Sequence, residues 1–308
     1  MASLIIGGTG FIGRHLCKTL VGSGASVRSL SRRGKPANAL QEVEYLQGFL
    51  SDEVAVRRAV RGSSVVWHFA SSTLPGSSLA EGIAALHEEV AATVRLCDIA
   101  VEEGVERLIF ASSGGTVYGI ASSDRLSEDH PTNPISAYGV QKLAIEKYLY
   151  LFENLNGFKS YVLRLGNPFG EDQDWHRPFG AVANFVNRAI RKLPIHVWGD
   201  GSVVRDYFHV DDLGDAFLRI AKYEGPERVF NIGSGNGTSV KELISIIGEL
   251  LPGQMSISYD ASRRGDVPYN VLDISKARNE LDWTPRIQLI EGVRRVLASA
   301  LSESTTIT

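Results

Sequence analysis

A tyrosine and a lysine spaced by one helical turn are the residues of this chain best suited to chemistry. Tyr138 and Lys142 are four positions apart, and side chains with that spacing share one face of a helix. A lysine charge lowers the pKa of a nearby phenol because it favours the phenolate. Such a phenol can exchange a proton with a substrate hydroxyl while a hydride moves at the carbon that carries it. A Tyr-x-x-x-Lys pattern is common by chance, so it needs a second signal.

Glycines near the N-terminus supply that second signal. Gly7, Gly10 and Gly13 are three residues apart and follow an apolar run at 4–6. In a dinucleotide-binding loop the first glycine permits a tight turn, the second lets the backbone approach the pyrophosphate, and the third lets the helix pack on the sheet. The helix N-terminus then offers free N–H groups to the phosphates. Together the two patterns predict hydride chemistry with a nicotinamide cofactor.

The residues after the second predicted strand bear on which cofactor binds. Ser31, Arg32 and Arg33 follow this strand, expected at 26–30, and no acidic residue precedes Glu42. A carboxylate at this point binds the ribose hydroxyls of NAD, whereas two guanidiniums could pair with the 2′-phosphate of NADP. The two arginines could equally be solvated loop charges or stack on adenine. These residues favour NADP as the cofactor, with NAD as the alternative.

Composition excludes several classes of protein. The chain has 308 residues, of which 44% are hydrophobic and 22% charged, and a net charge of −3, so it has no general attraction to nucleic acid or anionic membranes. No apolar run approaches the ~20 residues of a membrane span. Cys17 and Cys97 have neither metal-site spacing nor a disulfide framework. We expect no metal, no nucleic-acid or membrane partner, and a reducing, cytoplasmic compartment.

Short β-rich runs alternate with helical periods through the first half of the chain. This alternation predicts an α/β fold, a Rossmann-type doubly wound parallel sheet with helices on both faces. Strands are expected at 4–6, 26–30, 65–69, 107–111 and 160–165, and helices at 13–22, 55–61, 81–103 and 138–154. Later elements are a helix at 181–192, strands at 203–209 and 228–232, and helices at 239–251 and 290–302. We expect a dinucleotide-binding domain at 1–167 plus about 204–233, and a smaller α/β substrate-binding lobe at about 168–203 plus 234–308.

Further motifs follow one another along almost the whole chain. Besides the glycine loop and the Tyr–Lys pair, they lie at 68–70, 112–119, 163–168, 198–201, 205–212, 230–233 and 263–267. In this order they resemble the extended short-chain dehydrogenase/reductase family, and within it the NAD-dependent sugar-nucleotide epimerase/dehydratase group, with the texture of a UDP-hexose 4-epimerase.

The resemblance implies roles for individual residues. Tyr138 would be the general acid and base, and Lys142 its activator and a ligand of the nicotinamide ribose. Asn167, Arg205 and Arg263 would bind the diphosphate and nucleoside of a nucleotide sugar, most simply a UDP-linked one. The implied cofactor is NAD, and the expected cofactor-binding residues are Gly7, Gly10, Phe11, Ile12, Gly13, Ser31, Arg32, Arg33, Leu50, Phe69, Ala70, Tyr138 and Lys142.

Departures from the family pattern narrow the reaction. Gly114 stands where the family has a catalytic Ser or Thr, so we expect a neighbouring hydroxyl to replace it, Thr116 before Ser113; both could instead only support the loop. No acidic residue follows as it does in the family's dehydratases, which disfavours dehydration. Phe49 stands where an acidic adenine contact is common, and Glu89 where an Asn is usual.

One position bears on the sugar. Asn270 lies four residues beyond Asp266, where the family's 4-epimerases gate the C2 substituent of the hexose. A residue smaller than Tyr there implies that N-acetylhexosamines fit, with Asp266 also in the substrate site.

Two enzyme functions and one non-enzymatic function remain open. The first is NAD-dependent 4-epimerisation of a UDP-hexose or UDP-N-acetylhexosamine through a transient 4-keto sugar, as in polysaccharide biosynthesis. The alternative is an NADPH-dependent reductase of a nucleotide-linked 4-keto-6-deoxysugar, which Arg32 and Arg33 favour. A protein that binds the cofactor without turnover is disfavoured by the intact Tyr–Lys pair. Family members commonly dimerise through a four-helix bundle, so helices 81–103 and 138–154 predict a homodimer.

Overall fold

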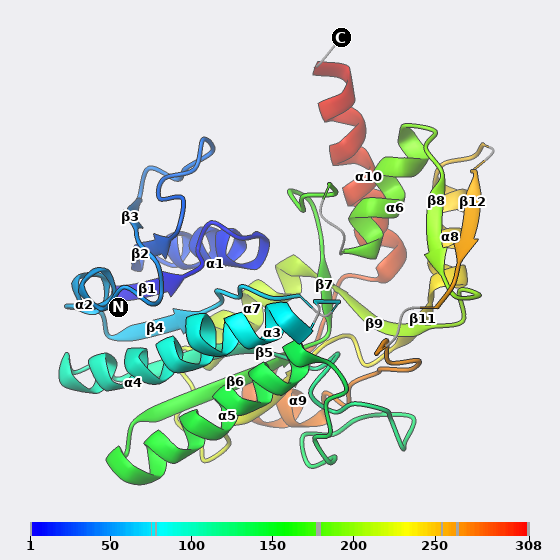
Figure 1. The fold of residues 1–308 in the computed structure, drawn as a ribbon. Helices are drawn as coiled ribbons and strands as arrows, with labels where there is room; N and C mark the ends of the chain where they lie inside the picture. Colours follow the sequence, from blue (N-terminus) through cyan, green and yellow to red (C-terminus); the bar gives the residue numbers. More distant parts are fainter. Residues whose placement is uncertain are drawn as a thin grey trace.

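Seven strands form one parallel sheet in the order β10-β6-β5-β4-β1-β2-β3. The computed structural model describes residues 2–74, 76–77, 79–176, 180–253, 255–262 and 265–306, and Figure 1 shows the sheet with its helices. The strands are β1 (Ala2–Ile6), β2 (Ser26–Ser31), β3 (Val43–Gln47), β4 (Val65–His68), β5 (Arg107–Ser113), β6 (Lys159–Leu165) and β10 (Val229–Ile232). The predicted Rossmann-type α/β class is confirmed.

The strand order places a ligand crevice between β1 and β4. From β1 the chain runs outward to β2 and β3 on one side, and then to β4, β5 and β6 on the other. Where the strand order reverses, adjacent crossovers leave the sheet on opposite faces, and ligands bind at the carboxyl ends of the strands. Gly7 follows β1, Phe69 follows β4, and β5 ends at Ser113.

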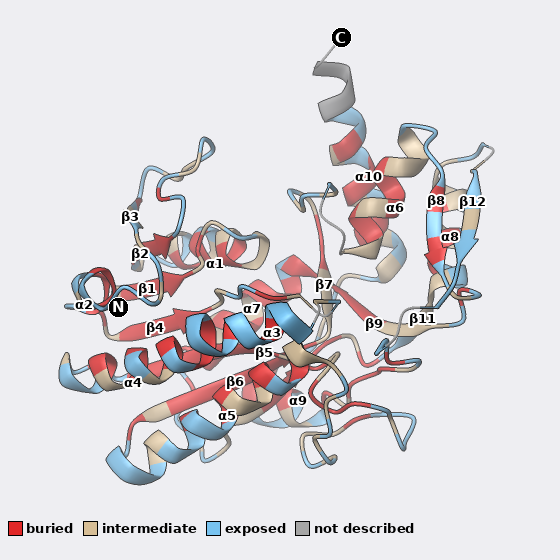
Figure 2. Cartoon of the chain, in the orientation of Figure 1, coloured by how far each residue is buried: buried red, intermediate tan, exposed pale blue. Residues whose placement is uncertain are grey.

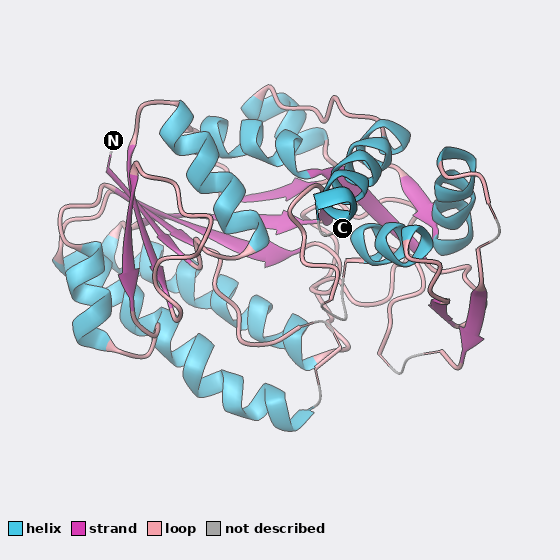
Figure 3. Ribbon diagram, turned by 90° about the horizontal axis from the view of Figure 1, so that it is seen from above, coloured by secondary structure: helices cyan, strands magenta, loops and turns pink. Residues whose placement is uncertain are grey.

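Helices cover both faces of the sheet, and each face has its own apolar core. Helices α1 (Phe11–Gly22) and α7 (Val210–Ile220) cover one face, and α2 (Glu53–Val60), α4 (Ala92–Glu102) and α5 (Ala137–Asn156) cover the other. Alternation along β1 serves both cores, because Ile5 packs into one and Leu4 and Ile6 into the other. Burial on both faces explains why the central strands β1 and β4 are mostly apolar, as the buried strands in Figure 2 and the layers in Figure 3 show.

The prediction of one continuous α-helix at 81–103 is wrong, because a π-helical turn interrupts it. It consists of α3 (Leu79–Ala85), a π-helical turn η1 (Leu86–Ala91) and then α4. A π turn inserts an extra residue into the helical ladder and is frequent at functional sites. It carries Glu89, a carboxylate that is only 2% exposed.

The second lobe is built from short strands and three helices. β9 (Val204–His209) lies between β7 (Asn167–Phe169) and β11 (Gly237–Ser239), and β8 (Ile195–Trp198) pairs with β12 (Ile257–Asp260). Helices α6 (Ala181–Ile190), α8 (Val240–Leu250) and α10 (Leu289–Thr306) pack around a third core, while α9 (Ser275–Leu281) contacts β10 of the large sheet. The expected strand at 203–209 therefore exists, but it does not join the large sheet, whereas the strand expected at 228–232 does. The lobe boundaries remain an expectation.

Membrane-spanning helices and groups of metal ligands are both absent from the described residues. Within them no helix is both long and apolar enough to traverse a bilayer, and they contain no group of three or more His, Cys, Asp or Glu side chains arranged to hold a metal ion. Cys17 and Cys97 are free and buried, and burial raises the pKa of each thiol to about 12.

Candidate active site

The glycine loop has the tight geometry that its sequence predicts. Gly7 has φ of +89°, and a Cβ there would lie 2.7 Å from the amide nitrogen of Ala70. A Cβ on Gly13 would lie 2.2 Å from the Gly7 carbonyl oxygen, so α1 packs directly on the turn. Helix α1 begins at Phe11 with Gly10 as an N-cap that has no side-chain cap and no acid in its first turn. Its first amides are therefore available to an anion.

The end of β2 presents two guanidiniums to solvent. Ser31 is buried and its hydroxyl donates to the Gly34 carbonyl over 3.3 Å. Arg32 and Arg33 are exposed, and within the part of the chain that the structure describes neither side chain has a hydrogen-bond or ion-pair partner. Leu50 is half-buried against the core under α2. Both arginine side chains are thus accessible to a phosphate group.

Tyr138 and Lys142 lie together in the first turns of α5, as their spacing predicts. The helix is capped by the Ser136 hydroxyl, which accepts from the Gly139 amide at 3.2 Å. Lys142 Nζ lies 5.5 Å from the centre of the Tyr138 ring and 4.8 Å from that of Phe110 on β5. Lys142 is 2% exposed and Tyr138 is half-buried.

The pKa of Tyr138 differs from the sequence expectation. Burial raises it, Lys142 lowers it and Glu89 raises it again, and the net direction is upward. Lys142 thus lowers the pKa of the phenol as predicted, but desolvation and a neighbouring carboxylate, which the prediction did not include, outweigh the ammonium. Burial lowers the pKa of Lys142, but Glu89 and Tyr138 raise it by more. The net direction is upward, so Lys142 is protonated.

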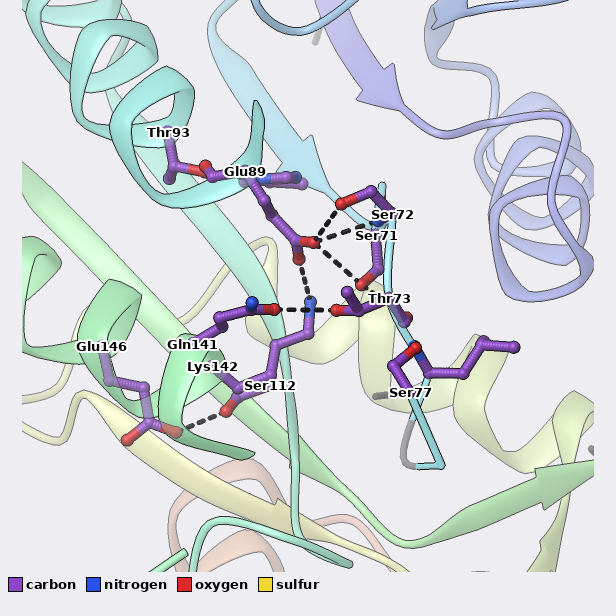
Figure 4. A network of polar contacts seen from close by, with 12 residues as sticks. Ser71, Ser72, Thr73, Ser77, Glu89, Thr93, Ser112, Gln141, Lys142 and Glu146 are labelled. Carbon is purple, nitrogen blue, oxygen red and sulfur yellow. Dashed lines mark hydrogen bonds and ion pairs between the residues drawn. The ribbon is translucent and has the colours of Figure 1, made fainter. Parts of the chain in front are cut away.

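Glu89 lies in the candidate site, although the sequence does not predict its contact with Lys142. Its Oε1 accepts from Lys142 Nζ at 3.1 Å, and its Oε2 accepts from the Ser72 amide at 3.0 Å and from the hydroxyls of Ser71 and Ser72 at 3.1 and 3.2 Å. Figure 4 shows the carboxylate between the lysine and the loop that follows β4. The only signal in the sequence was an acid where the family has an amide.

The loop after β5 lies against the start of α5. A Cβ on Gly139 would lie 2.8 Å from the Thr116 carbonyl oxygen, so Thr116 lies beside the residue that follows Tyr138. Thr116 Oγ1 is buried and has no hydrogen-bond partner within the described residues, which is rare for a native hydroxyl and calls for an explanation such as a ligand. Ser113, at the end of β5, is half-buried.

The expected substrate residues lie along β9 and the segment that pairs with it. Arg205 pairs with Asp266 at 2.5 Å, and Asn167 Nδ2 donates to the Asp206 carbonyl at 3.3 Å. Asn270 is fully buried, and its Nδ2 donates to the Gly114 carbonyl at 2.8 Å, while its Oδ1 has no partner within the described residues. Arg263 lies outside the described residues.

A protein-family model matches most of the chain. The model described as the NAD dependent epimerase/dehydratase family matches residues 3–233. The chain belongs to the NAD dependent epimerase/dehydratase family. The resemblance drawn from its motifs is thus confirmed.

Relatives and solved structures match this epimerase/dehydratase chain over almost its full length. A putative UDP-glucose 4-epimerase of Methanocaldococcus jannaschii is 31% identical, and the match covers 96% of each chain. A dTDP-4-dehydro-6-deoxyglucose reductase of Escherichia coli is 33% identical, again over 96% of each. The UDP-glucose 4-epimerase of Thermotoga maritima, solved with UDP-glucose, has a TM-score of 0.92, 32% identity and 100% coverage of both chains. That of Thermus thermophilus, solved with NAD, has a TM-score of 0.92, 30% identity and 98% and 99% coverage.

A second buried ion pair joins helix α5 to the sheet. Glu146, one turn after Lys142, pairs with Arg164 of β6 at 2.7 Å and accepts from the Ser112 hydroxyl of β5. Arg164 also donates to the Tyr118 hydroxyl at 3.1 Å. Because helix, both strands and the loop after β5 meet in this network, it fixes where Tyr138 lies relative to Thr116.

Proposed function

We propose that this protein catalyses NAD-dependent 4-epimerisation of a UDP-hexose. The observation that carries the proposal is that Lys142 lies beside the Tyr138 ring, while Thr116, whose buried hydroxyl has no partner within the described residues, packs against the same turn of α5. Epimerase relatives that match end to end support it.

The residues present fit a dinucleotide cofactor. The Gly7 turn has no room for a Cβ because it packs directly on the backbone of Phe69 and Ala70, and the uncapped N-terminus of α1 that follows the turn suits a pyrophosphate. Gly10, Phe11, Ile12 and Gly13 would hold the pyrophosphate, and Lys142 the nicotinamide ribose. NAD is the proposed cofactor because the relative of known structure from Thermus thermophilus was solved with it.

The chain supplies the proton chemistry and the positioning. When bound, NAD supplies the acceptor and donor of the hydride at C4 of the sugar. Tyr138 removes the proton from O4 and later returns it, and the Thr116 hydroxyl hydrogen-bonds the same oxygen. Lys142 remains protonated beside the phenol and stabilises its ionised form. Arg205 and Asn167 hold the diphosphate while the transient 4-keto sugar turns to present its other face.

The sugar and the nucleotide are finer parts of the proposal. A UDP-linked hexose is supported by the relative from Thermotoga maritima, which was solved with UDP-glucose. Admission of an N-acetyl group rests on Asn270, which is fully buried behind the Gly114 loop. Its unpartnered Oδ1 would have to face the sugar across that loop.

A reductase is the second candidate function. The Escherichia coli relative that reduces a dTDP-linked sugar is as similar in sequence as the epimerase relatives, and the exposed Arg32 and Arg33 would suit a 2′-phosphate. Stoichiometric oxidation of NADPH by a nucleotide-linked 4-keto-6-deoxysugar would favour this function over epimerisation.

A homodimer is also proposed. Exposed apolar side chains line two adjacent helical segments, Leu79 and Ile83 on α3 and Val140, Leu151 and Leu155 on α5. A Cβ on Gly82 would lie 2.6 Å from the Ala137 Cβ, so α3 packs closely on the first turn of α5, and neighbouring helices carry these exposed apolar residues. Such a surface on two helices suits a symmetric partner. The free buried cysteines support a reducing, cytoplasmic compartment.

The direct test compares the wild type with Tyr138→Phe. Incubation of UDP-galactose with the purified wild type, followed by chromatography, should yield UDP-glucose without added reductant. Tyr138→Phe should bind the nucleotide sugar and lose turnover by about 10²–10⁴-fold. Normal turnover in Tyr138→Phe would overturn the proposal.

A further inference from the structure

Glu89 and Lys142 form an ion pair that is almost completely removed from solvent. The two side chains are 2% and 3% exposed, and Lys142 Nζ lies 3.1 Å from Glu89 Oε1. The second carboxylate oxygen of Glu89 is held by the Ser72 amide and by two serine hydroxyls. Both oxygens are therefore fixed, and the lysine is joined to the loop after β4 as well as to its own helix (Figure 4).

Burying such a pair is costly unless its geometry is good and its remaining atoms are satisfied. Here the carboxylate has hydrogen bonds on both oxygens, and the ammonium also lies over the Phe110 ring. The π turn η1 brings Glu89 into the interior. The pair is thus built by three elements, η1, α5 and the loop after β4.

Few other charges face the pair. His68 of β4 is fully buried, and burial lowers its pKa to about 3, so it is neutral at working pH. Glu146 on α5 also acts on Lys142 but is itself paired with Arg164. Tyr138 is the remaining titratable neighbour of both charges.

We propose that Glu89 is a positioning residue, which holds the Lys142 ammonium through a buried ion pair and compensates part of the charge that Lys142 presents to Tyr138. The catalytic consequence rests on the proposed function, in which Tyr138 exchanges the proton of the sugar hydroxyl. In that role Glu89 tunes how readily Tyr138 gives up its proton, and it keeps Lys142 extended toward the loop after β4.

The test removes the charge of Glu89 and follows Tyr138 without any substrate. The protein is labelled with 13Cζ-tyrosine, and the Tyr138 signal is assigned by its loss in Tyr138→Phe. In Glu89→Gln the Tyr138 signal should titrate ~1 pH unit lower than in the wild type, because the full lysine charge then acts on the phenol. Glu88→Gln, an exposed neighbour on the same turn, should leave the titration unchanged. An unchanged or higher Tyr138 titration in Glu89→Gln overturns the proposal.

A second measurement uses the wild type and does not depend on whether Glu89→Gln folds. Burial raises the pKa of Glu89, but Lys142 and the Ser72 amide lower it more, so the net direction is downward. In protein labelled with 13Cδ-glutamate, the Glu89 signal is assigned as the one that is lost in Glu89→Asp. In the wild type this signal should remain that of the ionised carboxylate when the pH falls below 4.5. Titration of that signal at or above pH 4.5 would contradict the ion pair.

Failure of this inference can be told apart from failure of the proposed function. Both titrations are made on the protein without substrate, so a shifted Tyr138 signal supports Glu89 even if no sugar is epimerised. If epimerisation occurs, the acid limb of the kcat pH profile should shift to lower pH in Glu89→Gln and should stay in place in Glu88→Gln. Epimerisation with neither shift would refute the role of Glu89 alone.

Discussion

Leu272 occupies the space that a side chain at position 114 would need. A Cβ on Gly114 would lie 2.7 and 2.9 Å from the two Cδ atoms of Leu272 and 3.1 Å from the Arg164 carbonyl oxygen. Position 114 is therefore a packed glycine, and Asn270 donates a hydrogen bond to its carbonyl. Leu272 therefore fills the space in which the family has a hydroxyl side chain, and the proposed reaction uses another hydroxyl.

Restoring a serine at this position should destabilise the protein. Gly114→Ser forces Leu272 or the backbone to move, and overpacking of this kind costs about 1–3 kcal/mol. Urea unfolding measures the loss, and the double variant Gly114→Ser with Leu272→Ala should recover part of it. If Gly114→Ser is as stable as the wild type, the packing argument is incorrect.

Thr116 should carry the hydroxyl function that position 114 lacks. Thr116→Val removes, at almost constant volume, a buried hydroxyl to which the described residues offer no partner, so we expect kcat for UDP-galactose to fall about 10²-fold with KM little changed. Thr116→Ser keeps the hydroxyl and should retain most activity. Ser113→Ala serves as the comparison, and a larger loss there than in Thr116→Val would exchange their roles.

The Glu89–Lys142 pair should make stability depend on pH in a defined way. The pKa of Glu89 is lower in the folded protein than its ordinary value of 4.5. The unfolded chain therefore takes up a proton first, and the stabilisation is complete above pH 4.5 and declines as the pH falls through the folded pKa. Removing one partner of a buried pair costs about 3–5 kcal/mol, so Glu89→Gln should lose that much at pH 7 in urea unfolding. The difference from the wild type should shrink in acid, and a difference independent of pH would contradict the pair.

The two arginines after β2 should govern discrimination between cofactors. They are exposed, and the described residues offer their side chains no partner. In a variant with Arg32→Ala and Arg33→Ala, binding of NADP should weaken about 10-fold or more because a charge-assisted contact to the 2′-phosphate is lost, while NAD binding changes little. Isothermal titration calorimetry gives both constants. Equal weakening of the two cofactors would indicate that the arginines contact the shared part of the dinucleotide.

The apolar surface of α3 and α5 should hold two chains together. Ile83 is 60% exposed and Leu155 72% exposed, and a charge at either would have to be buried in a dimer. Ile83→Glu should therefore shift the molar mass in solution from dimer to monomer, as measured by light scattering. Val54→Glu, at an 81% exposed position on α2 away from this surface, is the matched control. A wild type that is already monomeric would contradict the dimer.

The sequence predicted the parts of the site that depend on local rules. The glycine loop follows from backbone sterics, and the Tyr138–Lys142 pair follows from helical spacing, so both were found from residue type and position. Helix α7 is not among the predicted elements, although Leu213, Phe217 and Ile220 are buried with helical spacing. That signal was present in the sequence.

Other features have no local signature. The π turn at 86–91 inserts one residue without any proline or glycine to mark it, so the burial of Glu89 and its contact with Lys142 could not be predicted. The contact between Asn270 and Gly114 joins residues far apart in the chain and depends on how β9 pairs outside the large sheet. Tertiary packing, and not residue type, decides these contacts. For the same reason the sequence predicts that Lys142 lowers the pKa of Tyr138 but not that burial and Glu89 raise it by more.

Epimerisation of UDP-galactose in D2O tests the central claim most directly. If Tyr138 exchanges only the O4 proton while the hydride of C4 is removed and returned within the site, 1H NMR will show UDP-glucose that retains protium at C4. Absence of UDP-glucose, or UDP-glucose with deuterium at C4, would contradict the account.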